Sequence, residues 1–363
     1  MSLKVLVIDD SAYHRRTLTR IIAAAPDFEV VGTAADGEEA IKKVVTLQPD
    51  LLTLDLEMPR MDGFTFLRWL MSTFPRPALV VSSRESNKSV FRALELGAAD
   101  FVLKPVSYAS EQLGQIEGEV IAKLREIAAA RPDKLAMRAR RLAEPAPEPE
   151  PAGPLGRKKG AVPAVAGRYR CVAIGASTGG PPALQQVLTA FAADLPAAVV
   201  IAQHMPEGFT RMFAERLDRI VALRVREAVG DEELVPGLVL LAPGGKNLTV
   251  QSGTRGRVFV RIDAPSPTDR YIPSADRLLT SAAAVYGSQL VSVVLTGMGD
   301  DGALGTRAAR AAGGMTIAEA EESCVVFGMP REAIRTGAVQ RVLPLPEIGA
   351  FIAREVACGP EPV

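Results

Sequence analysis

Short apolar runs alternate with helix-length amphipathic segments over the first 130 residues. The runs are the expected strands, at residues 4–8, 30–33, 51–54, 78–82 and 101–103. The last helix of this part is expected at residues 111–129. Strands that alternate with helices form parallel sheets with right-handed crossovers. We therefore predict that residues 1–130 form a doubly wound α/β domain with a five-stranded parallel sheet.

The apolar periodicity stops near Arg131, and prolines alternate with other residues from Pro145 to Pro151. Such a proline-rich stretch can neither form a helix nor bury a core, and it favours extended polyproline II. Residues 131–168 are therefore expected to be a linker rich in proline, alanine and glycine.

Apolar and amphipathic segments alternate again over residues 169–357. Strands are expected at 171–174, 198–203 and 289–295, and helices after Pro181, at 210–220 and at 304–312. Strand-like runs with glycine-containing turns within 239–262 predict a β-hairpin. The pattern predicts a second doubly wound domain, Rossmann-like, with a mostly parallel sheet and a hairpin.

Composition excludes several classes of protein. Hydrophobic residues make up 48% and charged residues 23%, which is typical of soluble globular proteins. The 42 basic and 42 acidic side chains cancel, which argues against nucleic-acid binding. Three cysteines are too few for a disulfide framework, and neither a signal peptide nor a membrane-spanning apolar run is recognisable. We expect a cytoplasmic protein that inserts into no membrane.

Three aspartates follow expected strands of the first domain. Asp9 and Asp10 come after the first strand, and Asp55 comes after the third. Because the carboxyl ends of parallel strands meet at one edge of a sheet, these carboxylates are expected to converge and to bind Mg²⁺. Asp55 is then a candidate nucleophile toward phosphorus, with Ser82 and Lys104 at neighbouring strand ends to contact the phosphoryl oxygens.

These residues lie in motifs that resemble a response-regulator receiver domain. The motifs are Asp9-Asp10-Ser11, Asp55-Leu-Glu-Met-Pro-Arg-Met-Asp-Gly63, Ser82-Ser83 and Lys104-Pro105. The resemblance implies a flavodoxin-like fold with strand order 2-1-3-4-5, of which a receiver is the standard example. It also implies that Asp55 accepts a phosphoryl group from a histidine kinase, that Mg²⁺ is the cofactor, and that the Lys104–Pro105 bond is cis. The implied site residues are the metal ligands Asp9, Asp10 and Asp55 and the switch residues Ser82, Lys104 and Phe101.

A serine of the second domain stands on a predicted tight turn between a strand and a helix. Ser177 lies in Gly175-Ala-Ser-Thr-Gly-Gly180, and the two prolines that follow favour the first turn of a helix. Small neighbours let a substrate carbonyl approach the backbone, and a helix N-terminus stabilises developing negative charge. The motif lacks the spacing of a dinucleotide-binding loop or a P-loop. These features favour Ser177 as a nucleophile over a phosphate-binding role.

Few residues are candidates for the base and the acid that a nucleophilic serine needs. The chain has two histidines, and His204, directly after an expected strand, is the one in this domain. Asp300 and Asp301 follow the strand that ends at Leu295, and either could orient the imidazole. The chain order Ser, His, Asp differs from that of the α/β-hydrolases, the subtilisins and the chymotrypsins.

Four separated motifs of this domain resemble the chemotaxis-type protein-glutamate methylesterases. They are Gly175-Ala-Ser-Thr-Gly-Gly180, Gln203-His-Met-Pro206, Leu295-Thr-Gly-Met-Gly299 with Asp301-Gly302, and Ser323-Cys-Val-Val-Phe-Gly-Met-Pro-Arg-Glu-Ala333. The resemblance implies Ser177 as nucleophile, His204 as general base and Asp301 as orienting acid. It implies Met298 as a backbone oxyanion donor and Thr178 as a support for His204.

Two departures from the family pattern bear on this site. Asp300 stands where we expect an asparagine, and its charge would raise the pKa of the triad acid or repel an acidic substrate. Ala275 and Arg277 stand where we expect larger apolar residues. We therefore expect the tuning of the acid and the substrate contacts to differ from the pattern.

The two resemblances together imply a phosphorylation-regulated enzyme. It would hydrolyse glutamyl methyl esters on the cytoplasmic domain of a methylated chemoreceptor, with no cofactor for hydrolysis, and it would also deamidate glutamine. The receiver would inhibit the catalytic domain until Asp55 is phosphorylated. The alternatives are a phosphorylation-responsive adaptor and a Rossmann-like ligand-binding protein, both without esterase activity. A DNA-binding output is disfavoured because the second domain has no concentrated basic element.

Overall fold

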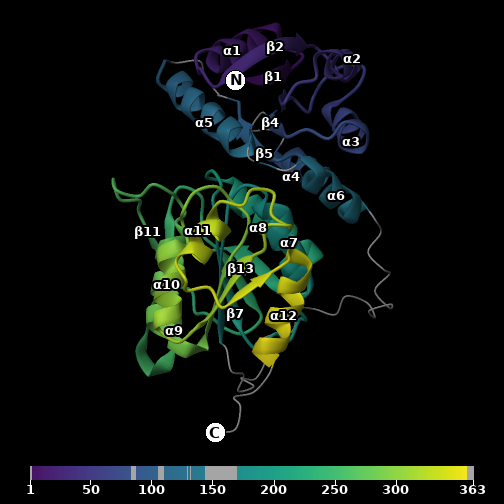
Figure 1. Ribbon diagram of the computed structural model, residues 1–363. Helices are drawn as coiled ribbons and strands as arrows, with labels where there is room; N and C mark the ends of the chain where they lie inside the picture. The colour runs from purple at the N-terminus through teal and green to yellow at the C-terminus, as the bar shows by residue number, and fades with distance from the viewer. Residues whose placement is uncertain are drawn as a thin grey trace. The chain divides into compact units, whose positions relative to one another are not determined.

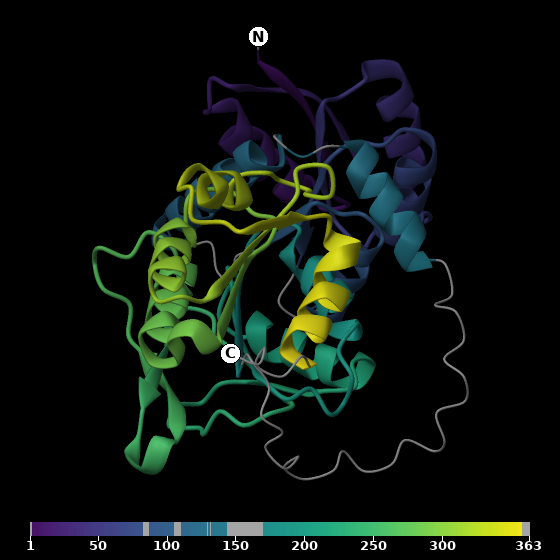
Figure 2. The same cartoon turned by 60° about the horizontal axis from the view of Figure 1, so that its bottom comes forward.

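The computed structural model describes residues 2–82, 87–104, 110–128, 130, 132–143 and 170–357. The chain divides into two compact units, at Met1–Pro149 and Glu150–Val363 (Figures 1 and 2). The expected isomer of the Lys104–Pro105 bond lies outside the described residues.

The first unit is a doubly wound α/β domain. Its five strands pair in parallel in the order β2-β1-β3-β4-β5, as predicted. The elements are β1 (Leu3–Ile8), α1 (Ala12–Ala23), β2 (Phe28–Ala34), α2 (Gly37–Leu47), β3 (Leu51–Leu54), α3 (Gly63–Thr73), β4 (Ala78–Ser82), α4 (Asn87–Glu95), β5 (Asp100–Leu103), α5 (Ser110–Ala128) and α6 (Pro132–Ala143).

Burial and capping explain why these elements form. All residues of β3 and β4 are buried, as expected of central parallel strands with helices on both faces. Polar side chains cap the helices that follow: Ser11, Asp36 and Asp62 each accept a hydrogen bond from a backbone N–H three residues later. Helices α1, α2 and α3 therefore begin in the connections that follow β1, β2 and β3, at the carboxyl edge of the sheet where the acidic residues lie.

A helix occupies the start of the range that we expected to be a linker. Helix α6 contacts α3 and α4, and its residues Leu135 and Ala136 are buried. The expectation that helical periodicity ends at Arg131 is wrong, because residues 132–143 are helical and the charged residues between their apolar positions obscure the pattern. Residues 144–168 lie outside the described part of the chain.

The second unit contains a seven-stranded sheet in the order β14-β13-β12-β6-β7-β9-β8, and its strand pairs are parallel. The predicted hairpin is the antiparallel pair β10–β11, whereas the segment just before it joins the main sheet as β9. The elements are β6 (Cys171–Ala176), α7 (Gly180–Thr189), β7 (Ala198–Gln203), α8 (Phe209–Ile220), β8 (Arg224–Glu227), β9 (Leu238–Leu241), β10 (Asn247–Ser252), β11 (Val258–Asp263), α9 (Ala275–Tyr286), β12 (Leu290–Val294), α10 (Ala303–Ala311), β13 (Met315–Glu319), α11 (Met329–Arg335), β14 (Arg341–Leu343) and α12 (Leu345–Ala357).

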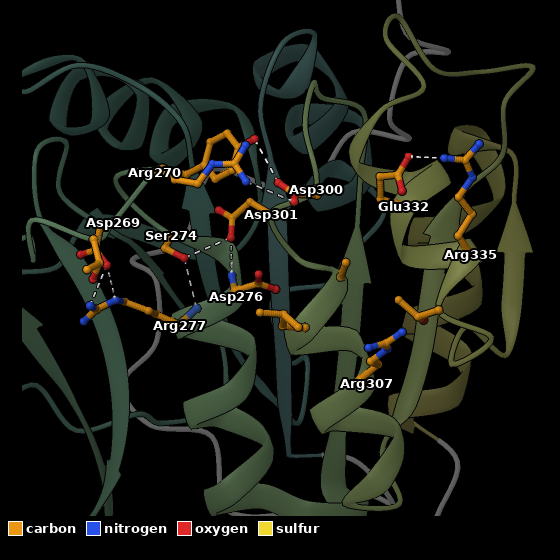
Figure 3. Close-up of a pocket in the computed structure, with 15 residues that line it drawn as sticks. Asp269, Arg270, Ser274, Asp276, Arg277, Asp300, Asp301, Arg307, Glu332 and Arg335 are labelled. Atoms are coloured by element: carbon orange, nitrogen blue, oxygen red, sulfur yellow. Dashed lines mark hydrogen bonds and ion pairs between the residues drawn. The ribbon is translucent and has the colours of Figure 1, made fainter.

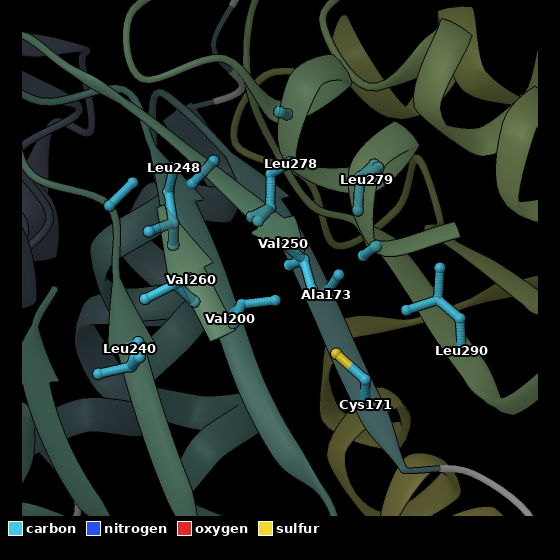
Figure 4. Packing of buried hydrophobic residues seen from close by; sticks show 14 of the residues in the cluster. Cys171, Ala173, Val200, Leu240, Leu248, Val250, Val260, Leu278, Leu279 and Leu290 are labelled. Carbon is cyan, nitrogen blue, oxygen red and sulfur yellow. The ribbon is translucent and has the colours of Figure 1, made fainter. Parts of the chain in front are cut away.

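Helices cover both faces of this sheet. Helices α7 and α12 pack together on one face, and α9 and α10 pack together on the other (Figures 1 and 2). The β10–β11 pair packs against α9, and residues of both join β6, β7 and β9 in one hydrophobic core (Figure 4). This core fixes the N-terminal end of α9 against the sheet.

A close contact between α9 and β6 depends on two small residues. A Cβ atom added at Gly175 would lie 2.6 Å from the Cβ of Ala275, which is fully buried. A larger side chain at either position therefore has no room unless the helix moves. Ala275, which departs from the family pattern, thus lets α9 lie directly on the strand that precedes Ser177.

Candidate functional site

The sheet order of the second unit brings the three predicted catalytic residues to one edge. Strand β6 lies between β7 and β12, so the chain leaves β6 at the point where the strand order reverses. Ser177 follows β6, His204 follows β7, and Asp301 lies in the loop after β12. Such a switch point is where parallel α/β sheets bind their ligands.

Backbone contacts fix Ser177 at this edge. Ser177 is 4% exposed, and its N–H donates to the Thr296 carbonyl at 3.0 Å. Its own carbonyl accepts from the Gly180 N–H at 2.7 Å and from Gln203 Nε2 at 3.0 Å. Gly297 lies so close that an added Cβ would be 2.6 Å from the Ser177 Cβ. The serine is held by three separate segments of the chain.

The Asp301 carboxylate is hydrogen-bonded to the imidazole of His204. The distance from His204 Nε2 to Asp301 Oδ2 is 2.8 Å, and Asp301 is 2% exposed. The two carboxylate oxygens also accept from Ser274 Oγ at 3.0 Å and from the backbone N–H groups of Ala275 at 2.6 Å and Asp276 at 2.8 Å. The acid therefore lies on the N-terminus of α9, where Ser274 is the N-cap.

The environment of Asp301 favours its charged form. Burial alone would raise the pKa of Asp301, but the hydrogen bond and charge of His204 and the N–H groups at the α9 N-terminus lower it below the ordinary value. Asp300, which we expected to raise this pKa, is not among the groups that shift it. The Asp300 side chain instead accepts a hydrogen bond from the Tyr271 hydroxyl at 3.1 Å.

Thr178 and Met298 are both close to the serine. Thr178 is buried, and its carbonyl accepts from Thr296 Oγ1 at 3.0 Å, so it fixes the turn after Ser177. Met298 follows Gly297, and within the described residues its backbone N–H donates to no protein acceptor. The oxyanion role of Met298 and the support of His204 by Thr178 stay predictions.

The sequence did not single out two side chains that shape this site. Gln203 Nε2 donates to the carbonyls of both Ser177 and His204 at 3.0 Å, and so ties the two turns together. Ser274 both caps α9 and donates to Asp301. The Pro273-Ser274 pair before an apolar helix was a usable sign of a helix N-terminus, but not of what that terminus binds.

A cavity of about 550 Å³ lies beside Asp301 (Figure 3). Its walls come from the segment before α9, from α10 and from α11, and they are lined by many charged side chains. Arg277 pairs with Asp269 at 2.7 Å and Arg335 pairs with Glu332 at 2.9 Å. The cavity beside Asp301 is thus lined by polar and charged groups.

Asp276 joins the N-termini of α9 and α10 within this wall. Its Oδ1 accepts the N–H groups of Gly302 at 2.8 Å and Gly305 at 2.7 Å. Burial raises the pKa of Asp276 to about 6, and the charge of Asp301 adds to this rise against the lowering effect of the N–H donors. The native state therefore retains this proton to a higher pH than the unfolded chain does.

We expect Asp276→Asn to gain stability relative to the wild type as the pH rises from 4 to 7. The unfolded side chain titrates near 3.8 and the native one near 6, so its contribution to native stability falls through this window. An asparagine keeps the single oxygen that accepts both N–H groups and does not titrate. The expected gain is about 1 kcal/mol after screening by solvent. Hydrogen exchange of β6 and β12 measures it for this unit alone, and a stability difference that is independent of pH contradicts the assignment.

The first unit brings its predicted acidic residues together. Asp9, Asp10 and Asp55 each offer a carboxylate oxygen, and these oxygens lie within 4.8 Å of one another. Lys104 Nζ lies 2.6 Å from Asp55 Oδ2 and 2.9 Å from Asp9 Oδ2. Burial raises the pKa of Asp55 and the Asp9 charge adds to this, while Lys104 opposes both.

The donor set of this cluster fits a hard divalent cation. It consists of carboxylates, two of them buried and the Asp10 one exposed, which leaves a side open to water and to a phosphoryl donor. Ser82 is buried at the end of β4, whereas Phe101 is buried within β5, opposite Val80 and three residues before Lys104. Ser83 of the motif lies outside the described residues.

Comparisons with known proteins match each of the two units to a known family. The family model described as CheB methylesterase matches residues 172–352, and the response regulator receiver domain model matches residues 5–114. A solved catalytic domain of CheB methylesterase from Thermotoga maritima is 40% identical, with a TM-score of 0.50, and covers 51% of this chain and 98% of its own. In the part of the chain that the structure describes, no helix is both long and apolar enough to cross a membrane.

Two relatives match along nearly the whole chain. A "protein-glutamate methylesterase/protein-glutamine glutaminase 3" of Geobacter sulfurreducens is 48% identical, over 98% of this chain and 98% of its own length. A protein of Myxococcus xanthus with the same name and the number 1 is 48% identical, over 97% of this chain and 96% of its own. The chain therefore belongs to the CheB methylesterase family, with a response-regulator receiver domain ahead of the catalytic domain.

Proposed function

We propose that this chain hydrolyses methyl esters of glutamate side chains in chemoreceptor proteins and that phosphorylation of Asp55 controls the reaction. The observation that carries the proposal is the buried Asp301 carboxylate bonded to His204, at the same sheet edge as Ser177. The names of the full-length relatives supply the substrate class. They also include glutamine deamidation, which passes through the same kind of tetrahedral intermediate.

Each residue has a defined step in this mechanism. Because Nε2 of His204 is bonded to Asp301, Nδ1 is the ring nitrogen that takes the proton of Ser177 Oγ. Ser177 Oγ attacks the ester carbonyl, and the backbone N–H of Met298 donates to the resulting oxyanion. The imidazolium returns the proton to the leaving methoxide, and methanol departs. Water then attacks the acyl-enzyme with His204 as base, and glutamate and Ser177 are regenerated.

The α9 N-terminus keeps Asp301 ready for this cycle. Its N–H donors hold the carboxylate ionised, so the negative charge that stabilises the imidazolium is already in place before substrate binds. The acid has no need to reorient, because four hydrogen bonds fix both of its oxygens.

The acidic cluster of the receiver is the proposed phosphorylation site, with a histidine kinase as the donor. Asp9, Asp10 and Asp55 would hold Mg²⁺, which when bound neutralises the charge of the transferring phosphoryl oxygens. Lys104 contacts Asp55 and has to exchange this contact for a phosphoryl oxygen. Ser82 and Phe101 would respond to that exchange and relieve an inhibition of the catalytic domain by the receiver.

Methanol release from a methylated receptor fragment tests the proposal. We expect acetyl phosphate with Mg²⁺ to raise the rate of the wild type by about 5- to 150-fold, the usual range of allosteric coupling. Asp55→Asn keeps the size of the side chain but cannot be phosphorylated, so its rate is expected not to respond. Ammonia release from a fragment that carries glutamine at the same position tests deamidation.

Three outcomes would overturn parts of the proposal. No methanol from a folded chain that is phosphorylated on Asp55 would favour the adaptor without esterase activity. A phosphodonor response that survives Asp55→Asn would place the phosphoacceptor elsewhere. If a chain without residues 1–149 were no more active than the intact unphosphorylated one, inhibition by the receiver would be wrong.

A further inference from the structure

An aromatic ring covers one face of the proposed general base. The rings of Tyr271 and His204 are stacked, with centroids 5.1 Å apart and planes 8° from parallel. Tyr271 comes from the segment just before α9, whereas His204 follows β7. The stack therefore joins two parts of the chain that are far apart in sequence.

Three neighbours hold the Tyr271 ring in this position. Its hydroxyl donates to Asp300 Oδ1 at 3.1 Å, and the exposed Arg270 guanidinium lies over its ring, 5.4 Å from the centroid. Arg270 Nη1 also lies 3.5 Å from Asp300 Oδ2 (Figure 3). Gly299 leaves space for the hydroxyl, because an added Cβ there would lie 2.2 Å from it.

The side chains of Asp300 and Asp301 point in different directions and contact different groups. Asp301 points inward to His204 and to the α9 N-terminus and is 2% exposed. Asp300 is exposed and points to Tyr271 and Arg270 (Figure 3). An exposed carboxylate exerts little direct electrostatic effect on its surroundings, since solvent screens it. Asp300 therefore affects the site mainly through its hydrogen bond with the Tyr271 hydroxyl.

The hydrogen bond to Asp301 alone does not fix the plane of the imidazole. One hydrogen bond at Nε2 restrains one ring atom, so the imidazole can still rotate about that bond and change the direction of Nδ1. A stacked ring restrains the plane itself, because tilting the imidazole forfeits contact over the whole face. The geometry of the proton transfer then depends on both contacts.

We propose that Tyr271 is a positioning residue for His204 and that Asp300 acts through Tyr271, as the anchor of its hydroxyl. This inference rests on the proposed esterase function for its kinetic consequence, but not for its structural one. It assigns a role to Asp300, the residue that departs from the expected family pattern. The pair sets how well the imidazole is aligned for the proton of Ser177.

Histidine NMR of the intact chain tests the structural part without any activity. The chain has two histidines, so their ring signals are easily resolved, and the spectrum of His204→Gln shows which of them belong to His204. His14, in the first unit, is the internal reference. We expect the His204 ring protons to be shifted upfield by the tyrosine ring, to lose that shift in Tyr271→Leu, and to keep only part of it in Tyr271→Phe, which retains a ring but loses the hydroxyl that Asp300 anchors. The shift is expected to weaken in Asp300→Ala and to persist in Asp300→Asn, which still accepts the hydroxyl proton.

Methanol release supplies the kinetic part. We expect kcat to fall by about 100-fold in Tyr271→Leu, as for other misplacements of a catalytic group by about 1 Å. Asp300→Ala and Tyr271→Phe are each expected to lower kcat by a smaller factor and Asp300→Asn to restore it, while KM changes little in all four variants. This rescue by the conservative variant distinguishes an anchor from a direct charge, because the amide is neutral.

The outcomes that overturn the inference are specific. Unchanged His204 ring shifts in Tyr271→Leu would show that the stack does not exist in solution. A kcat for Asp300→Asn as low as that for Asp300→Ala would make the charge of Asp300, and not its hydrogen bond, the relevant property. If the wild type released no methanol while the NMR shifts behaved as expected, the esterase proposal would fail and the positioning of His204 by Tyr271 would stand.

Discussion

Ser177→Ala is expected to reduce methanol release by about 10⁴-fold or more, to the residual rate that substrate binding and the oxyanion donor alone support. The alanine lacks the oxygen that forms the acyl-enzyme, so neither His204 nor the oxyanion donor has a covalent step to assist. The backbone contacts of residue 177 with Thr296 and Gly180 do not involve the side chain, so the fold is expected to be unchanged. Initial rates of methanol release on the phosphorylated chain measure the effect.

An exposed serine of the same unit provides the control for this variant. Ser288 lies before β12 and is exposed, so Ser288→Ala is expected to retain the wild-type rate. A Ser177→Ala protein that kept a tenth or more of the wild-type rate would show that another group attacks the ester.

Asp301→Asn is expected to lower kcat by about 10⁴-fold while substrate still binds. A neutral amide does not stabilise the imidazolium, and it favours the wrong tautomer of the His204 imidazole. The amide must also turn its NH₂ group toward a donor, because both oxygens of Asp301 accept backbone N–H groups. The variant is therefore also expected to be less stable, and denaturant unfolding measures this separately from kcat.

A matched aspartate separates these effects from a simple loss of charge. Asp194 is exposed, in the loop between α7 and β7, and Asp194→Asn is expected to change neither rate nor stability. If Asp301→Asn stayed within about 10-fold of the wild type, Asp301 would be a structural cap of α9 and not the orienting acid.

The strands and the chain positions of the site residues were predictable because their signals are local. Central parallel strands are buried on both faces, so they appear in the sequence as continuous apolar runs that end at the sheet edge. A reactive residue directly after such a run, as Ser177 or His204, is placed at that edge by the strand itself. The motif resemblance then separated Asp301 from Asp300.

The remaining features depend on contacts between segments that are distant in sequence. Nothing near Tyr271 in the chain indicates that its ring lies on His204, and nothing near Ser274 indicates that its hydroxyl meets Asp301. Helix α6 was missed for a related reason, since the helices that it contacts, α3 and α4, lie earlier in the chain and leave no sign in its own sequence. Pairwise geometry of this kind has no signature in the periodicity of one segment.

The contact between Gly175 and Ala275 has a consequence for how this enzyme tolerates change. The N–H groups that hold Asp301 belong to the first turn of α9, and the height of that turn above β6 is set by the volume of two residues without polar side chains. The position of Asp301, and with it the alignment of His204, thus depends on how tightly the interior packs. The range of substitutions that the active site accepts is limited as much by the size of buried neighbours as by the chemistry of the groups that react.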